Sequence, residues 1–239
     1  MRVDVRLGAG PRPRSGRLTE ETTVWERRSV WLRGKPRGWD DAWELGLRLI
    51  AAQGRDVEER PDTYFVLDRA DAGLKLRGSD ENDFDLKVLH QRSGHWELWE
   101  KCIFTTWNAL EAARLAAMLR VNPPMIDRFE DETPARGAEA LLERLGIPIA
   151  RVIVSKKRLQ AGGRDLMSVW PSFVVDPTSL VELVEIALPG RAERVFSLCL
   201  ESGTALSSPN EPFPASEAVY CGYPELLLRF CQDVGSNSR

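Results

Sequence analysis

The sequence predicts an α+β fold with a mostly antiparallel sheet. Many short runs are rich in β-branched and aromatic residues, and amphipathic helical patterns are interspersed among them. Few of these runs stand at the spacing of a strand–helix–strand unit, which favours antiparallel over parallel pairing. The 239 residues suffice for one large domain or two small ones with a buried core.

The N-terminal third begins with a flexible segment and continues with a strand and a helix. Residues 1–22 are assigned to this lead-in, because residues 8–22 are rich in Gly, Pro, Ser and Arg. The run TVWERRSVWLRG (23–34) predicts a strand that ends at Gly34. The run GWDDAWELGLRLIAAQG (38–54) predicts a helix, because its apolar residues recur at helical spacing and acids occupy its first turn.

The middle of the chain contains a series of predicted strands followed by two helices. Strands are predicted at about 63–68, 72–78, 84–90 and 95–104. The amphipathic run WNALEAARLAAMLRV (107–121) predicts a helix that ends before Pro123 and Pro124. Residues 122–134 form the most linker-like interior segment, and a second helix is predicted at 135–146.

The C-terminal part again mixes strands and helices. A strand is predicted in IARVIVSKKRLQ (149–160), and two more are predicted near 165–175 and 180–188. The run GRAERVFSLCLESG (190–203) is predicted to be a helix and SSPNEPFPAS a loop. The run YPELLLRFCQD (223–233) predicts a terminal helix.

The composition excludes several classes of protein. The formal net charge of −3 argues against a general nucleic-acid binder, although it permits a local basic site. No apolar run approaches the roughly 20 residues that span a bilayer, and the arginine-rich start lacks the hydrophobic segment of a secretory signal. Asp4 and the prolines near it argue against an organelle transit peptide. The four cysteines lack metal-site spacing, so free thiols and a cytoplasmic location are expected. No glycine-rich phosphate loop occurs.

Charged and apolar residues alternate in five of the predicted strands. Residues two apart share one face of a strand, so charged side chains of both signs gather on one face. These sets are Glu26 with Arg28, Lys75 with Arg77, Asp85 with Lys87, Glu97 with His95 and Trp99, and Lys156 with Arg158. One such strand is typical of a half-exposed sheet. Recurrence in five strands favours either an open binding face or a sheet that curls into a charged tunnel beneath a cover of helices.

This mixed-sign face predicts a particular ligand chemistry. Lysines and arginines gathered in a tunnel attract polyanions and neutralise the charge that develops during phosphoryl transfer. Carboxylates among them would repel the same anion, unless they hold Mg²⁺ or Mn²⁺, which bind carboxylate and phosphate oxygens together. The pattern therefore predicts a site for a triphosphate and its metal ion.

Several runs resemble, in order, the motifs of one superfamily. VWERRSVWL resembles an E-x-E-x-K strand, with Val24 and Glu26 at the acids and Arg28 at the lysine. PDTYFV resembles a D-T-Y-Y motif at its first three positions, residues 62–64. LKLRG is similar to an L-R-x-R motif, FDLKV to an L-K strand and HWELWEK to an acidic strand. VIVSKKR resembles a K-x-R strand, ELVEIAL a second E-x-E strand with Leu183 at its first acid, and GYPELLLRF a terminal Y-x-x-L-L helix. This series, over about residues 24–230, is similar to the CYTH, or triphosphate tunnel metalloenzyme, superfamily.

The resemblance implies a single domain over residues 23–239, with a mostly antiparallel β-barrel as a tunnel and helices packed outside it. It implies hydrolysis of inorganic triphosphate, thiamine triphosphate or a nucleoside triphosphate by water, dependent on Mg²⁺ or Mn²⁺. The implied catalytic residues are Glu26 and Glu97, and the implied metal ligands are Glu26, Glu97 and Glu185. The implied phosphate ligands are Arg28, Lys75, Arg77, Lys87, Lys156 and Arg158.

The sequence departs from that pattern at several positions. Val24 and Leu183 replace two of its acids. No D-x-D strand is visible in LMSVWPSFVVD, where Asp176 is the candidate substitute. Glu100 and Glu182 are further candidate metal ligands, and three carboxylates with water would hold one ion. The earlier run MRVDVRL is a second candidate for the opening strand.

Other functions remain open on the sequence alone. With two acids lost, the chain could be a non-catalytic module that binds a triphosphate or another phosphorylated ligand, and an adenylyl cyclase of the same fold is a third reading. Each charged residue, taken singly, could also be an ordinary surface or salt-bridged group. The expected partner is a small-molecule triphosphate, without membrane or general nucleic-acid binding, and the chain is expected to be a monomer or homodimer.

Overall fold

The structure is a computed structural model that describes residues 22–77, 84–122, 133–205 and 213–236. The predicted lead-in lies outside the described residues except for Thr22, and so does most of the linker-like segment 122–134. Among the described residues, no helix combines the length and the apolar character needed to cross a membrane.

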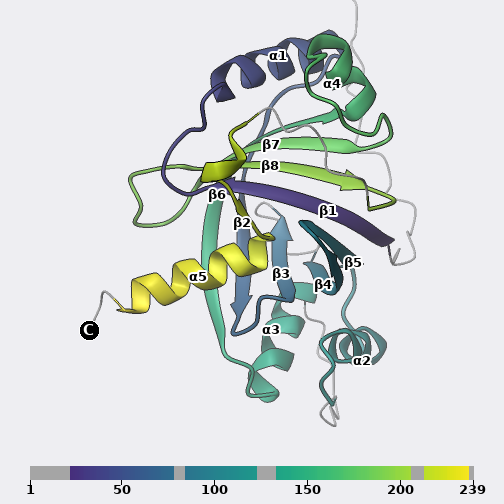
Figure 1. The fold of residues 1–239 in the computed structure, drawn as a ribbon. Coiled ribbons are helices and arrows are strands. Elements are labelled where there is room, and N and C mark those ends of the chain that lie inside the picture. Colours follow the sequence, from purple (N-terminus) through teal and green to yellow (C-terminus); the bar gives the residue numbers. More distant parts are fainter. Residues whose placement is uncertain (1–21, 78–83, 123–132, 206–212, 237–239) are drawn as a thin grey trace, which may run out of the picture.

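Eight antiparallel strands within the described ranges close into a barrel (Figure 1). They are β1 (Thr22–Trp31), β2 (Glu58–Leu67), β3 (Ala72–Arg77), β4 (Phe84–Ser93), β5 (Trp96–Phe104), β6 (Ile149–Gly162), β7 (Leu180–Ala187) and β8 (Val195–Ser202). Around the barrel the order is β5-β4-β3-β2-β6-β7-β8-β1, and β1 also pairs with β5. The predicted α+β barrel is confirmed, and the alternative of an open sheet is wrong.

Strand β1 closes the barrel because its two halves pair with different neighbours. Residues 22–26 pair with β5, and residues 25–31 pair with β8. Glu26 belongs to both ladders and stands opposite Glu97 on β5 and Glu201 on β8. A short strand, β9 (Val219–Tyr220), adds to the end of β1. Closure therefore brings acids from three strands to one level of the barrel.

Helices cover opposite sides of the barrel (Figure 1). They are α1 (Trp39–Ala52), α2 (Ala109–Met118), α3 (Pro134–Arg144), α4 (Gly163–Val169) and α5 (Tyr223–Ser236), with one 3₁₀ turn at Ala215–Glu217. Helices α2 and α3 bury the outer apolar residues of β2 to β5, such as Leu74 and Leu86. Helices α1 and α4 bury those of β6, β7 and β8, such as Leu159 and Leu198. The apolar halves of the alternating strands thus face helices, as predicted.

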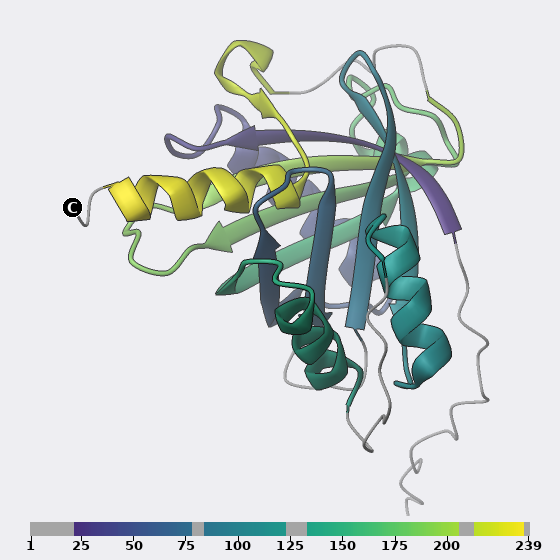
Figure 2. The same cartoon turned by 90° about the horizontal axis from the view of Figure 1, so that it is seen from below.

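Helix α5 lies across the barrel strands (Figure 2) and seals an apolar part of the interior. Its Leu226, Leu227 and Phe230 form one buried cluster with inward residues of β2 and β6, including Val66 and Val154. Burial of large apolar side chains of this kind contributes roughly 1.5–3 kcal/mol for each one. The remainder of the interior is charged, and it lies beside the first turn of α5.

The helix starts follow from local sequence. The Asn108 side chain caps α2 by accepting hydrogen bonds from the backbone N–H groups of Leu110 and Glu111, at 2.9 and 3.1 Å. Thr133 caps α3, and Pro134 occupies its first helical position, where a missing N–H costs nothing. The helices predicted at 38–54, 107–121, 135–146 and 223–233 are confirmed with shifted ends.

Two predicted elements are wrong. Residues 190–203, predicted as a helix, contain strand β8, because Phe196, Leu198 and Leu200 alternate outward while their neighbours face the interior. Residues near 165–175, predicted as a strand, instead begin with helix α4 and continue as a loop. That helix starts where the Gly163 N–H donates to the Ser179 carbonyl at 2.7 Å, and a Cβ on Gly163 would lie 2.4 Å from the Asp176 carbonyl oxygen.

Candidate functional site

The charged part of the barrel interior is a cavity of about 230 Å³, which we call the tunnel. All eight barrel strands contribute to its wall, together with the first turn of α5. Within the described residues, seven basic side chains line it: Arg28, Arg60, Lys75, Lys87, Lys101, Lys156 and Arg158. Its acidic lining consists of Glu26, Asp85, Glu182 and Glu201. The wall therefore carries an excess of positive charge.

Glu26 on β1 lies at the centre of the first ion-pair group. It bonds to the ammonium of Lys87, and the Lys101 ammonium lies 3.0 Å from the same oxygen. The Arg28 guanidinium lies 3.9 Å from its second oxygen. Burial acts to raise the pKa of Glu26, but Lys87, Lys101 and Arg28 outweigh it and hold this pKa well below its usual value. Glu26 is therefore ionised at neutral pH.

Asp62 on β2 anchors a second group on the opposite side of the barrel. Its side chain is fully buried, with the Lys156 ammonium 3.1 Å and the Lys75 ammonium 3.9 Å from one oxygen. The Arg60 Nε donates to the other oxygen at 2.9 Å. Burial acts to raise the pKa of Asp62, but these three cations lower it to about 2. Lys75 also lies 3.8 Å from Asp85, so two acids hold it.

Glu182 on β7 anchors a third group. Its two oxygens accept from Arg28 at 3.4 Å and from Arg158 at 2.9 Å, and Arg158 also bonds to Glu58 at the end of β2. Burial acts to raise the pKa of Glu182, but Arg28 and Arg158, helped by Lys156, lower it to about 2. The acids of the tunnel thus hold the basic side chains in fixed positions.

Two tyrosine rings lie beneath the cations. The Tyr223 ring of α5 has the Arg28 guanidinium and the Lys156 ammonium each 3.9 Å from its centroid. Lys156 also bonds to the Tyr64 hydroxyl. Burial lowers the pKa of Lys156 to about 8 against the opposing effect of Asp62 and Glu182, so its ammonium remains mostly charged at pH 7.

Glycines allow α5 to approach the tunnel closely. A Cβ on Gly73 of β3 would lie 2.5 Å from the Pro224 ring, and one on Gly222 would lie 2.8 Å from the Trp99 ring. Because neither glycine carries a side chain, Tyr223 and Pro224 can form part of the tunnel wall.

One group of described residues could hold a metal ion. Ligand atoms of Glu26, Cys199 and Glu201 lie within 4.8 Å of one another on the inner faces of β1 and β8. Mg²⁺ and Mn²⁺ prefer six oxygen ligands, whereas Cys199 offers a buried sulfur. The Lys101 ammonium already contacts both carboxylates, at 3.0 and 3.1 Å. This donor set fits a resident Mg²⁺ or Mn²⁺ poorly.

The structure brings most of the predicted site residues together. Glu26, Arg28, Lys75, Lys87, Lys156 and Arg158 all line the tunnel. Arg77 pairs with Asp62 in the β2–β3 ladder, but its side chain lies outside the described residues. Glu97 does not line the tunnel; it accepts from Arg92 at 3.1 Å and from the Trp99 indole at 3.2 Å. Burial raises the pKa of Glu97.

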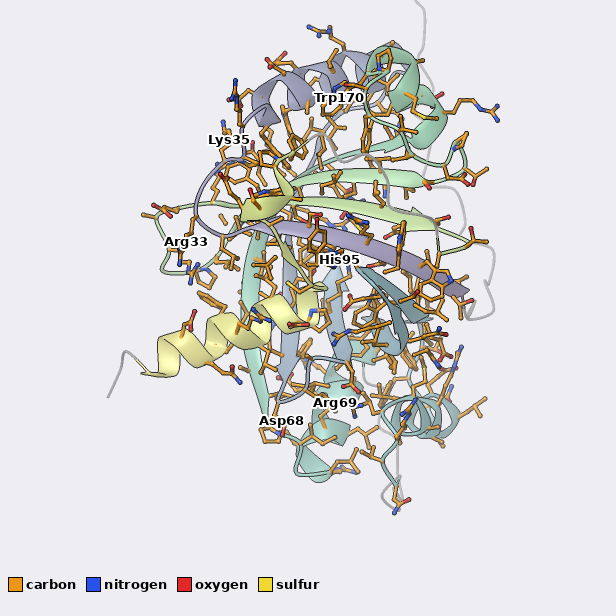
Figure 3. The ribbon with its side chains drawn as sticks, viewed as in Figure 1. Arg33, Lys35, Asp68, Arg69, His95 and Trp170 are labelled. Atoms are coloured by element: carbon orange, nitrogen blue, oxygen red, sulfur yellow. The ribbon has the colours of Figure 1, made fainter. Side chains whose placement is uncertain are left out.

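The structure does not bring Glu185 to the tunnel. It lies on the outer face of β7, where it accepts from Arg194 at 2.7 Å and from the Trp39 indole at 3.4 Å. The resemblance had aligned β7 one residue out of phase, since Glu182 is the acid of this strand that faces the interior. Glu100 faces outward too and bonds to His90. His95, which is labelled in Figure 3, shared the predicted face of Glu97. Its ring stacks on that of Tyr220, with the ring centroids 3.8 Å apart.

Sequence reasoning missed several tunnel residues: Arg60, Lys101, Glu201 and Tyr223. Lys101 was detectable, because it stands two residues after Trp99 on the same face of β5. Arg60 likewise precedes Asp62 by two residues on β2. Glu201 was hidden because its strand was predicted to be a helix. No local pattern indicates that Tyr223 turns from α5 into the barrel.

No family model matches this chain, and no curated protein matches it. Solved structures with a similar arrangement include a candidate adenylate cyclase from Bacillus halodurans, at 15% identity over 75% of this chain and 80% of that one, with a TM-score of 0.33. A protein of Pyrococcus horikoshii has 15% identity over 75% and 80%, with a TM-score of 0.36. A candidate adenylyl cyclase from Hippeastrum, described as having a dominant triphosphatase activity, has 12% identity over 76% and 80%, with a TM-score of 0.36. Because these TM-scores are low, the likeness carries no argument about function, which has to come from the residues of the tunnel.

Proposed function

We propose that the chain binds the phosphate groups of a triphosphate in the tunnel and hydrolyses the terminal phosphoryl group by attack of water. The observation that carries this proposal is the convergence of seven basic side chains on one cavity of about 230 Å³ inside the barrel. A polyanion would compensate their excess charge, and a small, linear one suits a cavity of this size. The resemblance of the ordered motifs to the triphosphate tunnel superfamily supports the same substrate class.

The buried acids prepare the cations for this role. Asp62 and Glu182 fix the directions of Lys156 and Arg28 before any ligand enters, so little reorganisation is needed when phosphate oxygens arrive. In phosphoryl transfer the protein contributes mainly by positioning and by stabilising negative charge. The remaining basic side chains of the tunnel wall supply the positive charge that stabilises it.

Glu26 and Glu97 are the two candidates for the base that takes a proton from the attacking water, and their pKa values shift in opposite directions. Glu26 is a weak base, since its neighbours hold its pKa well below the usual value. Glu97 is the stronger base, because burial raises its pKa. It contacts Trp99, and its carboxylate lies beside Gly222, both of which line the tunnel. Because Glu97 does not itself line the tunnel, we assign it the role of accepting the water proton through one intervening water molecule.

Mg²⁺ or Mn²⁺ enters this proposal with the substrate and serves the hydrolysis step rather than the affinity, since triphosphates in solution carry such ions on their oxygens. A second candidate function is binding without hydrolysis. It is favoured by the pairing of Glu26 with Lys87 and Lys101, which both contact the same oxygen of the carboxylate that would otherwise serve a reaction.

The test measures phosphate release from tripolyphosphate, thiamine triphosphate and ATP, with Mg²⁺ and with EDTA, together with cyclic AMP formation from ATP. We expect release of phosphate without cyclic AMP. Binding without release would establish the binding module instead, cyclic AMP would indicate a cyclase, and absence of both binding and release would refute the proposal.

Two neighbouring lysines of β6 provide a matched pair of variants. Lys156 faces the tunnel, whereas Lys157 faces outward and pairs with Glu59 at 3.6 Å. Lys156→Met should weaken tripolyphosphate binding at least about tenfold, the usual effect of losing one charge-assisted hydrogen bond. Lys157→Met removes the same charge and should leave the affinity unchanged in isothermal titration calorimetry. Equal effects of the two variants would show that the tunnel is not the binding site.

A further inference from the structure

A cluster in the tunnel has the outline of a divalent-metal site. Glu26 and Glu201 are direct cross-strand neighbours on β1 and β8, and their carboxylates face the interior together. Cys199 precedes Glu201 by two residues on the same face, and the three ligand atoms fall within 4.8 Å. Two adjacent carboxylates that are largely shielded from water require a positive charge between them.

The side chain of Lys101 supplies that charge. Lys101 comes from β5, which pairs with β1 on the side away from β8, and its ammonium reaches across β1 to both acids. Its Nζ lies 3.0 Å from Glu26 Oε1 and 3.1 Å from Glu201 Oε2. An ion that used these two oxygens would have to occupy the space of the ammonium.

The surroundings also disfavour a dication. Glu26 bonds to Lys87 as well and lies 3.9 Å from Arg28, so it is already shared by three cations. A divalent ion placed there would meet repulsion from each of them. The third possible ligand, Cys199, is a fully buried thiol, which a hard ion does not select.

We propose that the ammonium of Lys101 takes the place of a resident divalent cation, so that the chain binds a triphosphate without a protein-bound metal. The positive charge between Glu26 and Glu201 is then the Lys101 side chain itself and not a bound ion. The consequence for triphosphate binding rests on the proposed function, whereas the exclusion of a metal by Lys101 does not.

The first test measures Mn²⁺ binding by electron paramagnetic resonance without any triphosphate. The wild-type chain should show no specific binding below about 1 mM, the weak end of biological sites for hard divalent ions. Lys101→Met should open the Glu26–Glu201 pair and tighten Mn²⁺ binding at least about tenfold. Lys87→Met is the matched control, because it removes the same charge from Glu26 while Lys101 stays between the two acids; it should gain no Mn²⁺ binding. Equal Mn²⁺ affinity in the wild type and Lys101→Met, or equal gains in both variants, would overturn the proposal.

The second test needs no variant and remains decisive if Lys101→Met does not fold. The affinity of the wild-type chain for tripolyphosphate is measured by calorimetry in EDTA and in Mg²⁺. The two dissociation constants should agree within about threefold, and a loss of about tenfold or more in EDTA would overturn the inference. If tripolyphosphate binds under neither condition, the proposed function fails, while specific Mn²⁺ binding by the wild type would still decide against the role of Lys101.

Discussion

Replacing Asp62 by asparagine should destabilise the fold strongly, although the change removes only one charge. Asp62 is fully buried and pairs with Lys156, Lys75 and Arg60. Its carboxyl has a pKa of about 2 instead of 3.8, which corresponds to about 2.4 kcal/mol of stabilisation of the ionised form. The substitution also leaves the buried Lys156 ammonium without its nearest acid, and breaking a buried pair costs about 3–5 kcal/mol. We expect a loss of about 3 kcal/mol.

The assay is urea unfolding at pH 7, compared through the midpoint at constant m value. Glu59→Gln is the control, because its pair with Lys157 is on the outer surface and contributes at most about 1 kcal/mol. The double variant Asp62→Asn with Lys156→Met removes both members and should recover part of the loss. A single variant within 1 kcal/mol of the wild type, or a double variant less stable than the single one, would refute the reasoning.

Two further predictions concern the acids of the barrel. Because the pKa values of both Asp62 and Glu182 are lowered to about 2, their contribution to stability is fully present above about pH 4.5 and is lost as the pH falls toward 2. The urea midpoint should therefore fall steeply over that range in the wild type and less in Asp62→Asn; parallel curves would contradict this. Glu97→Gln should lower kcat for triphosphate hydrolysis about 100-fold or more while tripolyphosphate affinity stays the same. Glu100→Gln, an outward acid of the same strand, should change neither quantity, and a Glu97→Gln enzyme of normal kcat would show that another group accepts the proton.

The charged residues of β1, β3, β4 and β6 that face the tunnel could be predicted from sequence. They alternate with apolar residues, and this two-residue period is visible within each strand alone. Lys75 and Lys87 share the tunnel face for this reason. Which residues of a strand face inward is harder to predict where two acids lie close together in the sequence. In VELVEIAL both Glu182 and Glu185 look plausible, and only the pairing of β7 with β6 and β8 decides which one faces inward.

The misassignment of β8 had a different cause. The segment VFSLCLES mixes small, polar and apolar residues, and its alternation can be confused with an amphipathic helix. Its strand form is enforced by neighbours on both sides: β7, the strand that precedes it in the chain, and β1, which lies far away in sequence. The position of Glu201, and with it the ammonium-bridged acid pair, therefore depended on tertiary pairing that no local pattern contains.

The double pairing of β1 has a consequence for how the tunnel is assembled. Residues 22–31 pair with residues 195–202, so the wall of the cavity is complete only when both segments are present and paired. A nascent or truncated chain that ends before β8 would carry all of the lysines but no complete barrel to hold them together. An anion that binds only the completed cavity would stabilise the closed barrel relative to every partly assembled form of the chain.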